Sequence, residues 1–213
     1  MDLYFSPLAC SLATRISLYE AGAEAGFIEV DPKTKRVMND GSDYTQVYPL
    51  GLVPAIRLED GGLLTENAAI LQYVADRFPG ANLAPKDGLA RTRLQQWLCF
   101  IGTELHKGLF VPLFDRKAPE GTAANTLAKG ESRLAYLNSH LTGRDFLLDS
   151  FSVADAYLYT VLNWSIATPV KFDRYPAIAA YFERLKKRPS IAKAFGEELA
   201  LYKAEQARHK QAA

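Results

Sequence analysis

The chain has 213 residues with 25 Lys and Arg against 24 Asp and Glu, and a net charge of +1 gives no electrostatic reason to expect nucleic acid or a membrane surface as a partner. Its 48% hydrophobic content is ordinary for a globular protein, which excludes a disordered or fibrous chain. No apolar run approaches the roughly 20 residues of a membrane span, and the N-terminus lacks the basic start of a secretory signal, so we expect a cytoplasmic protein with free thiols.

Strand-like and helix-like patterns alternate over the first part of the chain. Four short apolar runs predict strands, at 2–5, 27–30, 54–58 and 63–64. The last two flank Asp60-Gly61, a strong hairpin signal. Helical spacing is found over 12–19 and 66–77, and the polar stretch 33–49 allows at most a short helix near 44–48. The order strand, helix, strand, short helix, strand, strand, helix predicts a small α/β domain over residues 1–80.

The composition changes after residues 81–87, which lie in the Pro- and Gly-rich run PGANLAPKDG and predict a linker. Residues 88–203 contain no convincing strand and predict an all-α domain, with its first helix over 88–109 and a last short helix ending near 201. Ser152 and Asp155 form a capping-box pattern in which Asp155 is structural. Residues 204–213 are a polar tail that we expect to fray. The fold class is therefore α/β plus all-α.

Cys10 stands where the first predicted strand passes into the first predicted helix. The unpaired N–H groups and the positive end of the helix dipole at that point favour a thiolate over a thiol. A buried, inert cysteine is the alternative, but the position at a strand end favours a reactive one. Because position 13 is Ala13, a dithiol pair is excluded, and disulfide chemistry at Cys10 needs an external thiol.

Pro54 opens the third predicted strand, since a proline can begin a strand but cannot donate to its ladder. Taken alone, it favours a trans proline at a sheet edge. A cis Val53-Pro54 bond would instead leave the backbone of Val53 able to pair with an extended peptide.

The segment Thr65-Glu66-Asn67 precedes the helix over 66–77. Its backbone N–H groups and the helix dipole suit an anion, and the Glu66 carboxylate suits an ammonium group. Together they fit the α-amino acid end of a ligand. Simple capping of the helix by Thr65 is the alternative and is compatible with binding.

Four stretches together resemble the cytosolic glutathione S-transferases, specifically the bacterial beta class. They are YFSPLACSLATRISLYEAG, YPLGLVPAIRLEDGGLLTENAAILQYVAD, QQWLCFIGTELHKGLFVPLF and FSVADAYLYTVLNW, spanning residues 4–164. The resemblance implies a thioredoxin-like glutathione-binding domain over residues 1–80, an all-α domain over residues 88–203 that lines a pocket for electrophiles, and a homodimer. The apolar surface of the helices over 66–77 and 88–109 favours the same assembly.

On this resemblance, Cys10 is the residue that faces the sulfur of glutathione and can form a mixed disulfide with it, and Ser11 follows it as in the family. Val53, before Pro54, pairs through its backbone with the cysteinyl part of glutathione.

The resemblance also implies contacts to both ends of the tripeptide. Glu66 and Asn67 match the pair that holds the γ-glutamyl end, although the family usually has Ser or Gly where Asn67 stands, so we expect altered contacts. Lys35 matches a basic residue near the glycyl carboxylate. A solvated loop lysine is the alternative, because Lys33 and Arg36 are its neighbours.

Thr103, Glu104 and His106 match the helical segment with which the second domain closes the site. A neutral His106 imidazole can hydrogen-bond the glutathione thiol, and its cation can stabilise the thiolate. We interpret His140 and His209 as ordinary surface or core histidines.

Cys99 stands where close relatives often have Asn, and a thiol is the poorer hydrogen-bond partner, so a peripheral contact to glutathione and a buried structural role are both open. Trp97 and Trp164 lie on apolar helical faces, where core packing is the first interpretation. Trp164 can instead line the electrophile pocket with Leu8 and Ala9.

The predicted function is conjugation of the glutathione thiolate, as co-substrate, to small hydrophobic electrophiles in detoxification. Because Cys10 rather than Ser or Tyr faces the sulfur, glutathione-dependent thiol transfer with reduction of disulfides is an alternative. A non-catalytic protein that binds hydrophobic ligands is the third. Three scattered histidines and two distant cysteines predict no metal site.

Overall fold

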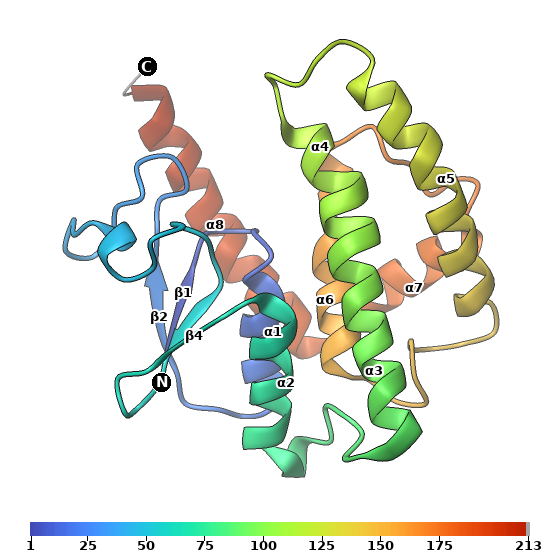
Figure 1. Ribbon diagram of the computed structural model, residues 1–213, viewed down its shortest axis with the longest axis horizontal. Coiled ribbons are helices and arrows are strands. Elements are labelled where there is room, and N and C mark those ends of the chain that lie inside the picture. The colour runs from blue at the N-terminus through green and yellow to red at the C-terminus, as the bar shows by residue number, and fades with distance from the viewer. Residues whose placement is uncertain (212–213) are drawn as a thin grey trace. The chain divides into compact units, whose positions relative to one another are not determined.

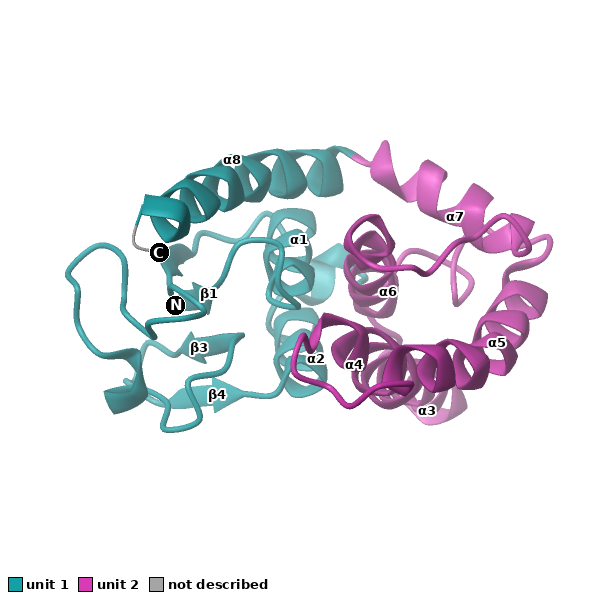
Figure 2. Cartoon of the chain, turned by 90° about the horizontal axis from the view of Figure 1, so that it is seen from above, with its two compact units in different colours: residues 1–83, 189–213 teal, residues 84–188 magenta. Residues whose placement is uncertain are grey.

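The computed structural model describes residues 1–211, which form two compact units (Figure 1). Unit 1 comprises residues 1–83 and the chain from Pro189 onward, and unit 2 comprises residues 84–188 (Figure 2). This division differs from the predicted one at its C-terminal end, because the last helix packs with unit 1.

Unit 1 is a four-stranded mixed sheet with three α-helices. Its elements are β1 (Asp2–Phe5), α1 (Leu12–Glu20), β2 (Gly26–Glu29), the 3-10 turn η1 (Tyr44–Gln46), β3 (Ala55–Arg57), β4 (Leu63–Thr65), α2 (Asn67–Arg77), the 3-10 turn η2 (Pro79–Ala81) and α8 (Pro189–Gln211). The strand order is β2-β1-β3-β4, with β1 parallel to β2 and β3 antiparallel to β1 and β4. The predicted order of elements up to α2 is confirmed, including the short helix between β2 and β3.

The two faces of the sheet bury different side chains, because side chains alternate along a strand. One face packs against α1 and α2, with a core of Leu3, Phe5, Leu18, Ile56, Ile70 and Val74. The other face is covered by the loop that follows β2 and by η1, with a core of Tyr4, Val30, Val37, Tyr44 and Ala55. The long polar stretch before β3 is therefore a packed layer of unit 1.

Helix α8 has 23 residues, where the sequence predicted a short helix and a frayed tail over 204–213. Leu201 packs against the helix-covered core of the sheet. Further along, Arg208 forms an ion pair with Glu29 at the end of β2, and the His209 ring contacts the Asp31 carboxylate just after it. These contacts from distant parts of the chain stabilise a segment whose polar composition alone suggests fraying. The last two residues of the predicted tail lie outside the described residues.

Unit 2 is helical. Its elements are α3 (Gly88–Phe100), the π-helix η3 (Ile101–Phe110), α4 (Val111–Phe114), α5 (Thr122–Leu141), α6 (Val153–Asn163), the 3-10 turn η4 (Trp164–Ala167) and α7 (Pro176–Lys186). Every residue of α6 is buried, as expected for a central helix that is hydrophobic on all sides.

The predicted capping box at the start of α6 is present. The Ser152 N–H donates to the Asp155 carboxylate at 2.9 Å, and the same carboxylate accepts from the Leu147 N–H and the Tyr181 hydroxyl. Burial raises the pKa of Asp155, while these donors oppose the rise. Asp155 therefore has a structural role, joining the start of α6 to α7.

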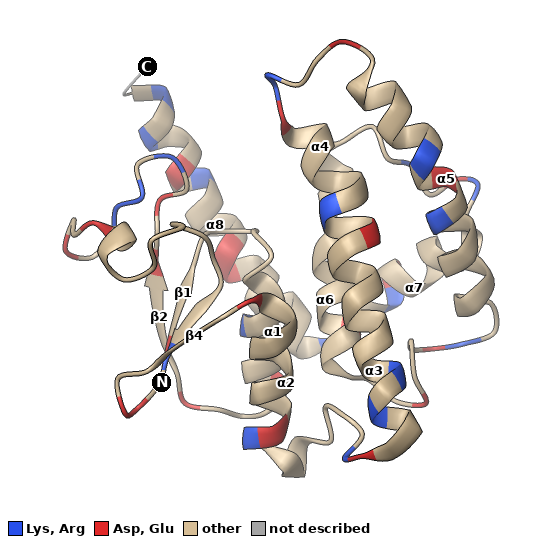
Figure 3. Cartoon of the chain, viewed as in Figure 1, with Lys and Arg blue, Asp and Glu red and all other residues tan. Residues whose placement is uncertain are grey.

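Lys and Arg are interspersed with Asp and Glu in both units, in keeping with the near-zero net charge (Figure 3). Among the described helices, none is long and apolar enough to cross a membrane. Within residues 1–211, no group of three His, Cys, Asp or Glu side chains is arranged to hold a metal ion.

Candidate active site

Four segments of unit 1 meet at one edge of the sheet. Phe5 pairs with Glu29 where the parallel strands β1 and β2 end, and Ala55, where β3 begins, pairs with Thr65 at the end of β4. Ala55 also pairs with Tyr4 of β1. The adjoining loops therefore share this edge. They carry the predicted glutathione residues of unit 1, which are Cys10, Ser11, Lys35, Val53, Pro54, Glu66 and Asn67.

Cys10 lies half-buried in the loop between β1 and α1. Its thiol donates to the Val53 carbonyl at a distance of 3.2 Å. The Val53-Pro54 bond is cis, so the trans bond favoured by Pro54 alone is wrong. Two residues that stand far apart in the sequence, and that the resemblance placed beside the same part of glutathione, are thus in direct contact.

Ser11 is fully buried, and its hydroxyl is used within the Cys10 loop. It donates to the Ser6 carbonyl and accepts from the Ser6 N–H, both at 3.3 Å. The Ser6 hydroxyl in turn donates to the Val30 carbonyl at 2.6 Å. Ser11 therefore stabilises the loop that carries Cys10. The sequence placed Ser11 next to Cys10 but did not predict this role.

The Asn67 side chain also forms hydrogen bonds within unit 1. Its amide donates to the Cys10 carbonyl at 3.1 Å, and its side-chain oxygen accepts from the Thr14 hydroxyl at 3.1 Å. The side chain therefore joins the start of α2 to the Cys10 loop and to α1. The Asn67 amide thus supports the loop that carries Cys10 directly.

Backbone strain is concentrated at the predicted site. Within the described residues, positive φ angles at residues other than Gly occur at Leu8 (60°), Lys35 (58°), Glu66 (66°) and Asn82 (53°). Three of these four were predicted site residues. A side chain at positive φ costs on the order of 1–3 kcal/mol, and such residues cluster where the backbone serves a ligand. Glu66 is exposed and its carboxylate does not cap α2, so helix capping does not explain the positive φ angle of Glu66.

Lys35 lies in the loop after β2 and faces the segment that leads into β3. A Cβ atom placed on Gly51 would approach the Lys35 Cδ to 3.2 Å, so the lysine stem lies across this glycine. The Lys35 carbonyl accepts from the Tyr44 N–H at 2.9 Å, and the Tyr44 hydroxyl donates to the Leu52 carbonyl at 2.9 Å. These contacts connect Lys35 to the residue that precedes Val53 and oppose the interpretation of Lys35 as a freely solvated lysine.

Sequence reasoning missed one buried carboxylate beneath the Cys10 loop. Glu198 of α8 is fully buried and accepts from the Leu8 N–H at 2.7 Å. Arg15 of α1 lies 3.3 Å from its other oxygen and stacks over the rings of Phe5 and Phe27. Burial raises the pKa of Glu198 to about 8, against the opposing effects of Arg15 and the Leu8 N–H. The sequence of α8 is rich in charged residues, and nothing in it distinguishes Glu198 from the exposed ones.

In unit 2 the segment with Thr103, Glu104 and His106 is a π-helix, where the sequence predicted a continuous helix over 88–109. Long π-helices are rare, and π-helical turns are frequent at functional sites. His106 is buried, with its Nδ1 atom 2.8 Å from the Tyr157 hydroxyl. Burial, together with the charge of the nearby Lys107, lowers the pKa of His106 to about 4. The imidazole is therefore neutral near pH 7, which favours the neutral role over the cationic one.

The other predicted residues of unit 2 have local partners. The Thr103 hydroxyl donates to the carbonyl of Cys99 at 3.0 Å, and Glu104 pairs with Arg133 at 3.0 Å. The Cys99 side chain is exposed, not buried as one interpretation had it. Trp164 begins η4, and its ring centroid lies 4.8 Å from that of His106.

Family models match both parts of the chain. The N-terminal domain model of the glutathione S-transferases matches residues 9–77, and the C-terminal domain model matches residues 120–184. The glutathione S-transferase GstA of Escherichia coli O157:H7 is 42% identical over 200 residues, which are 93% of this chain and 98% of that protein. The chain belongs to the glutathione S-transferase family. The predicted enzyme class is therefore confirmed.

Solved structures of similar proteins indicate the class within the glutathione S-transferase family. A sphingomonad transferase described as complexed with glutathione has a TM-score of 0.88 and 42% identity, covering 93% of this chain and 98% of its own. A bacterial beta-class transferase of Sphingomonas chungbukensis has a TM-score of 0.88 and 41% identity over the same shares. The beta-class resemblance and the thioredoxin-like plus all-α fold are thus confirmed. Neither family model reaches α8.

Proposed function

We propose that this transferase binds glutathione at the sheet edge of unit 1 and adds the glutathione thiolate to small hydrophobic electrophiles. The observation that carries the proposal is the contact between the Cys10 thiol and the Val53 carbonyl, with the start of α2 joined to Cys10 through Asn67. An extended tripeptide can pair with the Val53 backbone, direct its sulfur towards Cys10 and bring its α-amino acid end to Glu66. The sphingomonad relative is described as complexed with glutathione, which supports this ligand.

The chemistry requires a thiolate on glutathione. A free thiol has a pKa of about 8.5, so the protein must supply hydrogen-bond donors that stabilise the charged sulfur. That sulfur attacks an electrophilic carbon, a carbon–sulfur bond forms, and a leaving group such as halide departs with the bonding electron pair. Two adjacent thiolates would repel each other, so conjugation needs Cys10 as a neutral thiol, the form that can donate to the Val53 carbonyl.

The second candidate function is thiol transfer, and the identity of Cys10 favours it. As a thiolate, Cys10 attacks the glutathionyl sulfur of a mixed disulfide, and the other thiolate leaves. A second glutathione thiolate then attacks the glutathionyl sulfur on Cys10, which releases glutathione disulfide and restores the Cys10 thiolate. No second protein cysteine is needed, in agreement with Ala13 and with the exposed position of Cys99 on α3.

Three further statements remain proposals. Leu8, Ala9 and Trp164 are the residues proposed to contact the electrophile. His106 hydrogen-bonds the glutathione thiol as a neutral imidazole. The protein is a cytoplasmic homodimer, for which light scattering at micromolar concentration should give twice the mass of the chain, while the mass of one chain would contradict the assembly.

The proposed function is tested with two assays on the same preparation. Conjugation of glutathione to a chromogenic aryl halide follows the first reaction, and reduction of a glutathione mixed disulfide follows the second. Activity in either supports catalysis. Binding of a hydrophobic ligand with neither activity would favour the non-catalytic alternative. Failure of calorimetry to detect glutathione binding at millimolar concentrations would reject the glutathione site.

A further inference from the structure

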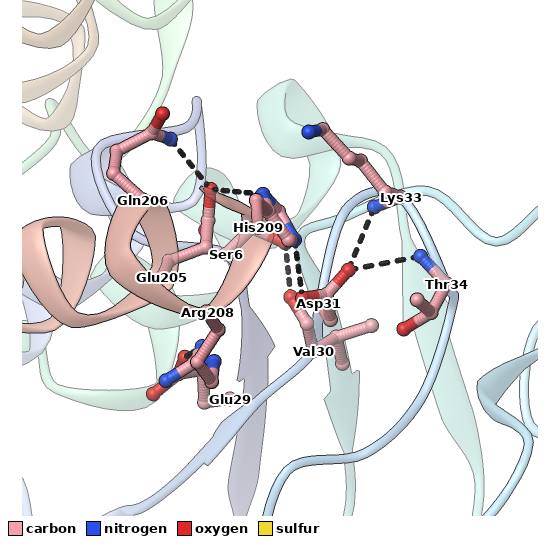
Figure 4. A network of polar contacts seen from close by, with 10 residues as sticks. All are labelled: Ser6, Glu29, Val30, Asp31, Lys33, Thr34, Glu205, Gln206, Arg208 and His209. Atoms are coloured by element: carbon pink, nitrogen blue, oxygen red, sulfur yellow. Dashed lines mark hydrogen bonds and ion pairs between the residues drawn. The ribbon is translucent and has the colours of Figure 1, made fainter. Parts of the chain in front are cut away.

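The last turn of α8 contacts the loop that carries Lys35 (Figure 4). The His209 Nε2 atom lies 2.7 Å from the Asp31 carboxylate, and the two side chains are only 10% and 6% exposed. On the neighbouring residue, Arg208 donates to Glu29 at 2.7 Å. Two adjacent residues of α8 therefore bind two side chains at the end of β2. The sequence interpretation of His209 as an ordinary histidine misses this contact.

Asp31 orders the loop after β2 with its other groups. Its second carboxylate oxygen accepts from the N–H groups of Lys33 and Thr34, both at 2.9 Å, and its carbonyl accepts from the Lys35 N–H at 3.0 Å. Burial acts to raise the pKa of Asp31, but these N–H groups and His209 lower it to about 2. Asp31 is therefore an ionised group that binds α8 through one oxygen and the Lys35 loop through the other.

Lys35 depends on this loop for its position. Its φ of 58° is an angle that a lysine rarely adopts without support from its surroundings, and its stem lies across Gly51 beside the segment that leads to Val53. A shift of Asp31 would move the Lys35 backbone directly, because the Lys35 N–H binds the Asp31 carbonyl.

We propose that His209 is a positioning residue which, through Asp31, holds Lys35 where it meets the glycyl carboxylate of glutathione. The inference rests on the proposed glutathione site. It assigns a part in ligand affinity to the C-terminal end of a helix that neither family model matches. A lysine held in place loses less conformational freedom on binding, so the contact raises affinity without touching the ligand.

The test compares calorimetric binding of glutathione with that of γ-glutamylcysteine, which lacks the glycyl carboxylate. His209→Ala should weaken glutathione binding by up to about threefold, the loss expected when Lys35 itself is removed, and leave γ-glutamylcysteine binding unchanged. His209→Gln, whose amide can donate to Asp31, should restore most of the loss. The exposed neighbour Lys210→Ala is the matched control and should bind both peptides as the parent does. In a Lys35→Ala background, His209→Ala should have no further effect.

Equal weakening of both peptides would overturn the inference, because it would mean a general loosening of unit 1. Unchanged binding of both would also overturn it. If the parent protein binds neither peptide, the proposed glutathione site itself fails, so the two failures are distinguishable. Should His209→Ala fail to fold, His209→Asn, whose amide is too short to span to Asp31, takes its place with the same expected loss.

Discussion

Cys10 and His106, the predicted catalytic residues of units 1 and 2, have contrasting surroundings. Cys10 is half-buried in a loop, and its thiol contacts a backbone carbonyl. His106 is 8% exposed on a π-helix and lies against a tyrosine hydroxyl and a tryptophan ring. A partly exposed thiol can exchange with an external disulfide, whereas a buried imidazole cannot readily gain a charge. Cys10 is thus suited to thiol–disulfide chemistry, and His106 to hydrogen bonding as a neutral group.

The largest expected effect separates the two proposed reactions. Cys10→Ala should reduce mixed-disulfide reduction by at least about 10³-fold, because the nucleophile is removed. Conjugation should fall by less than about tenfold, because other donors can stabilise the glutathione thiolate. Both rates are measured on one preparation, with Cys99→Ala as the control that should change neither. Loss of conjugation with disulfide reduction intact would reverse the assignment.

The next effect concerns the support of Cys10. Asn67→Ala should lower the free energy of unfolding by about 1–3 kcal/mol, because the Cys10 carbonyl and the Thr14 hydroxyl lose their partner in a buried place. Urea denaturation of the parent and the variant measures this. Asn67→Ser, whose hydroxyl can keep one of the two hydrogen bonds, should lie between them. A variant as stable as the parent would show that the two hydrogen bonds do not support the loop.

Glutathione affinity distinguishes the two ends of the site in unit 1. Glu66→Ala should weaken binding about tenfold, because Glu66 sits at the start of a packed helix and binds a charged group. Lys35→Ala should weaken it about threefold, because Lys35 lies on a loop and gains less from preorganisation. Calorimetric titration of both variants checks the order. A larger loss at Lys35 would contradict the view that α2 is the better-ordered part of the site.

Two buried groups should give opposite slopes of stability against pH. His106 has its pKa lowered from 6.5 to about 4, so the unfolded chain binds more protons in that window, and stability should fall as the pH drops from 6.5 to 4. Glu198 has its pKa raised from 4.5 to about 8, so the folded chain binds more protons, and stability should fall as the pH rises from 4.5 to 8. His106→Gln and Glu198→Gln should each remove one slope in urea denaturation across this range. If a variant shows the same dependence of stability on pH as the parent, burial does not shift the pKa of the residue that was replaced.

Most elements could be predicted because their signals are local. Apolar spacing predicts α1 and α2, and Asp60-Gly61 predicts the turn between β3 and β4. The family resemblance identified the predicted glutathione residues of unit 1. The strand order brings the loops that carry them to one edge of the sheet. These predictions depended only on residues close together in the sequence or on motifs shared with a known family.

The supporting residues could not be predicted in this way. Glu198 contacts Leu8 across 190 positions of the sequence, and His209 contacts Asp31 across 178. Neither pairing leaves a periodic trace in a single sequence. The change from α-helix to π-helix at Ile101 likewise leaves no trace in the apolar spacing over 88–109. Sequence reasoning thus found residues expected to face the ligand and missed those that hold them.

The most direct test of the central claim is to identify which cysteine forms a mixed disulfide with glutathione. The protein is treated with glutathione disulfide, and its intact mass and peptide map are measured. The account predicts one glutathionyl group, located on the half-buried Cys10 and absent from Cys10→Ala, although Cys99 is the more exposed thiol. Modification of Cys99 alone, or of neither cysteine, would contradict a glutathione site built around Cys10.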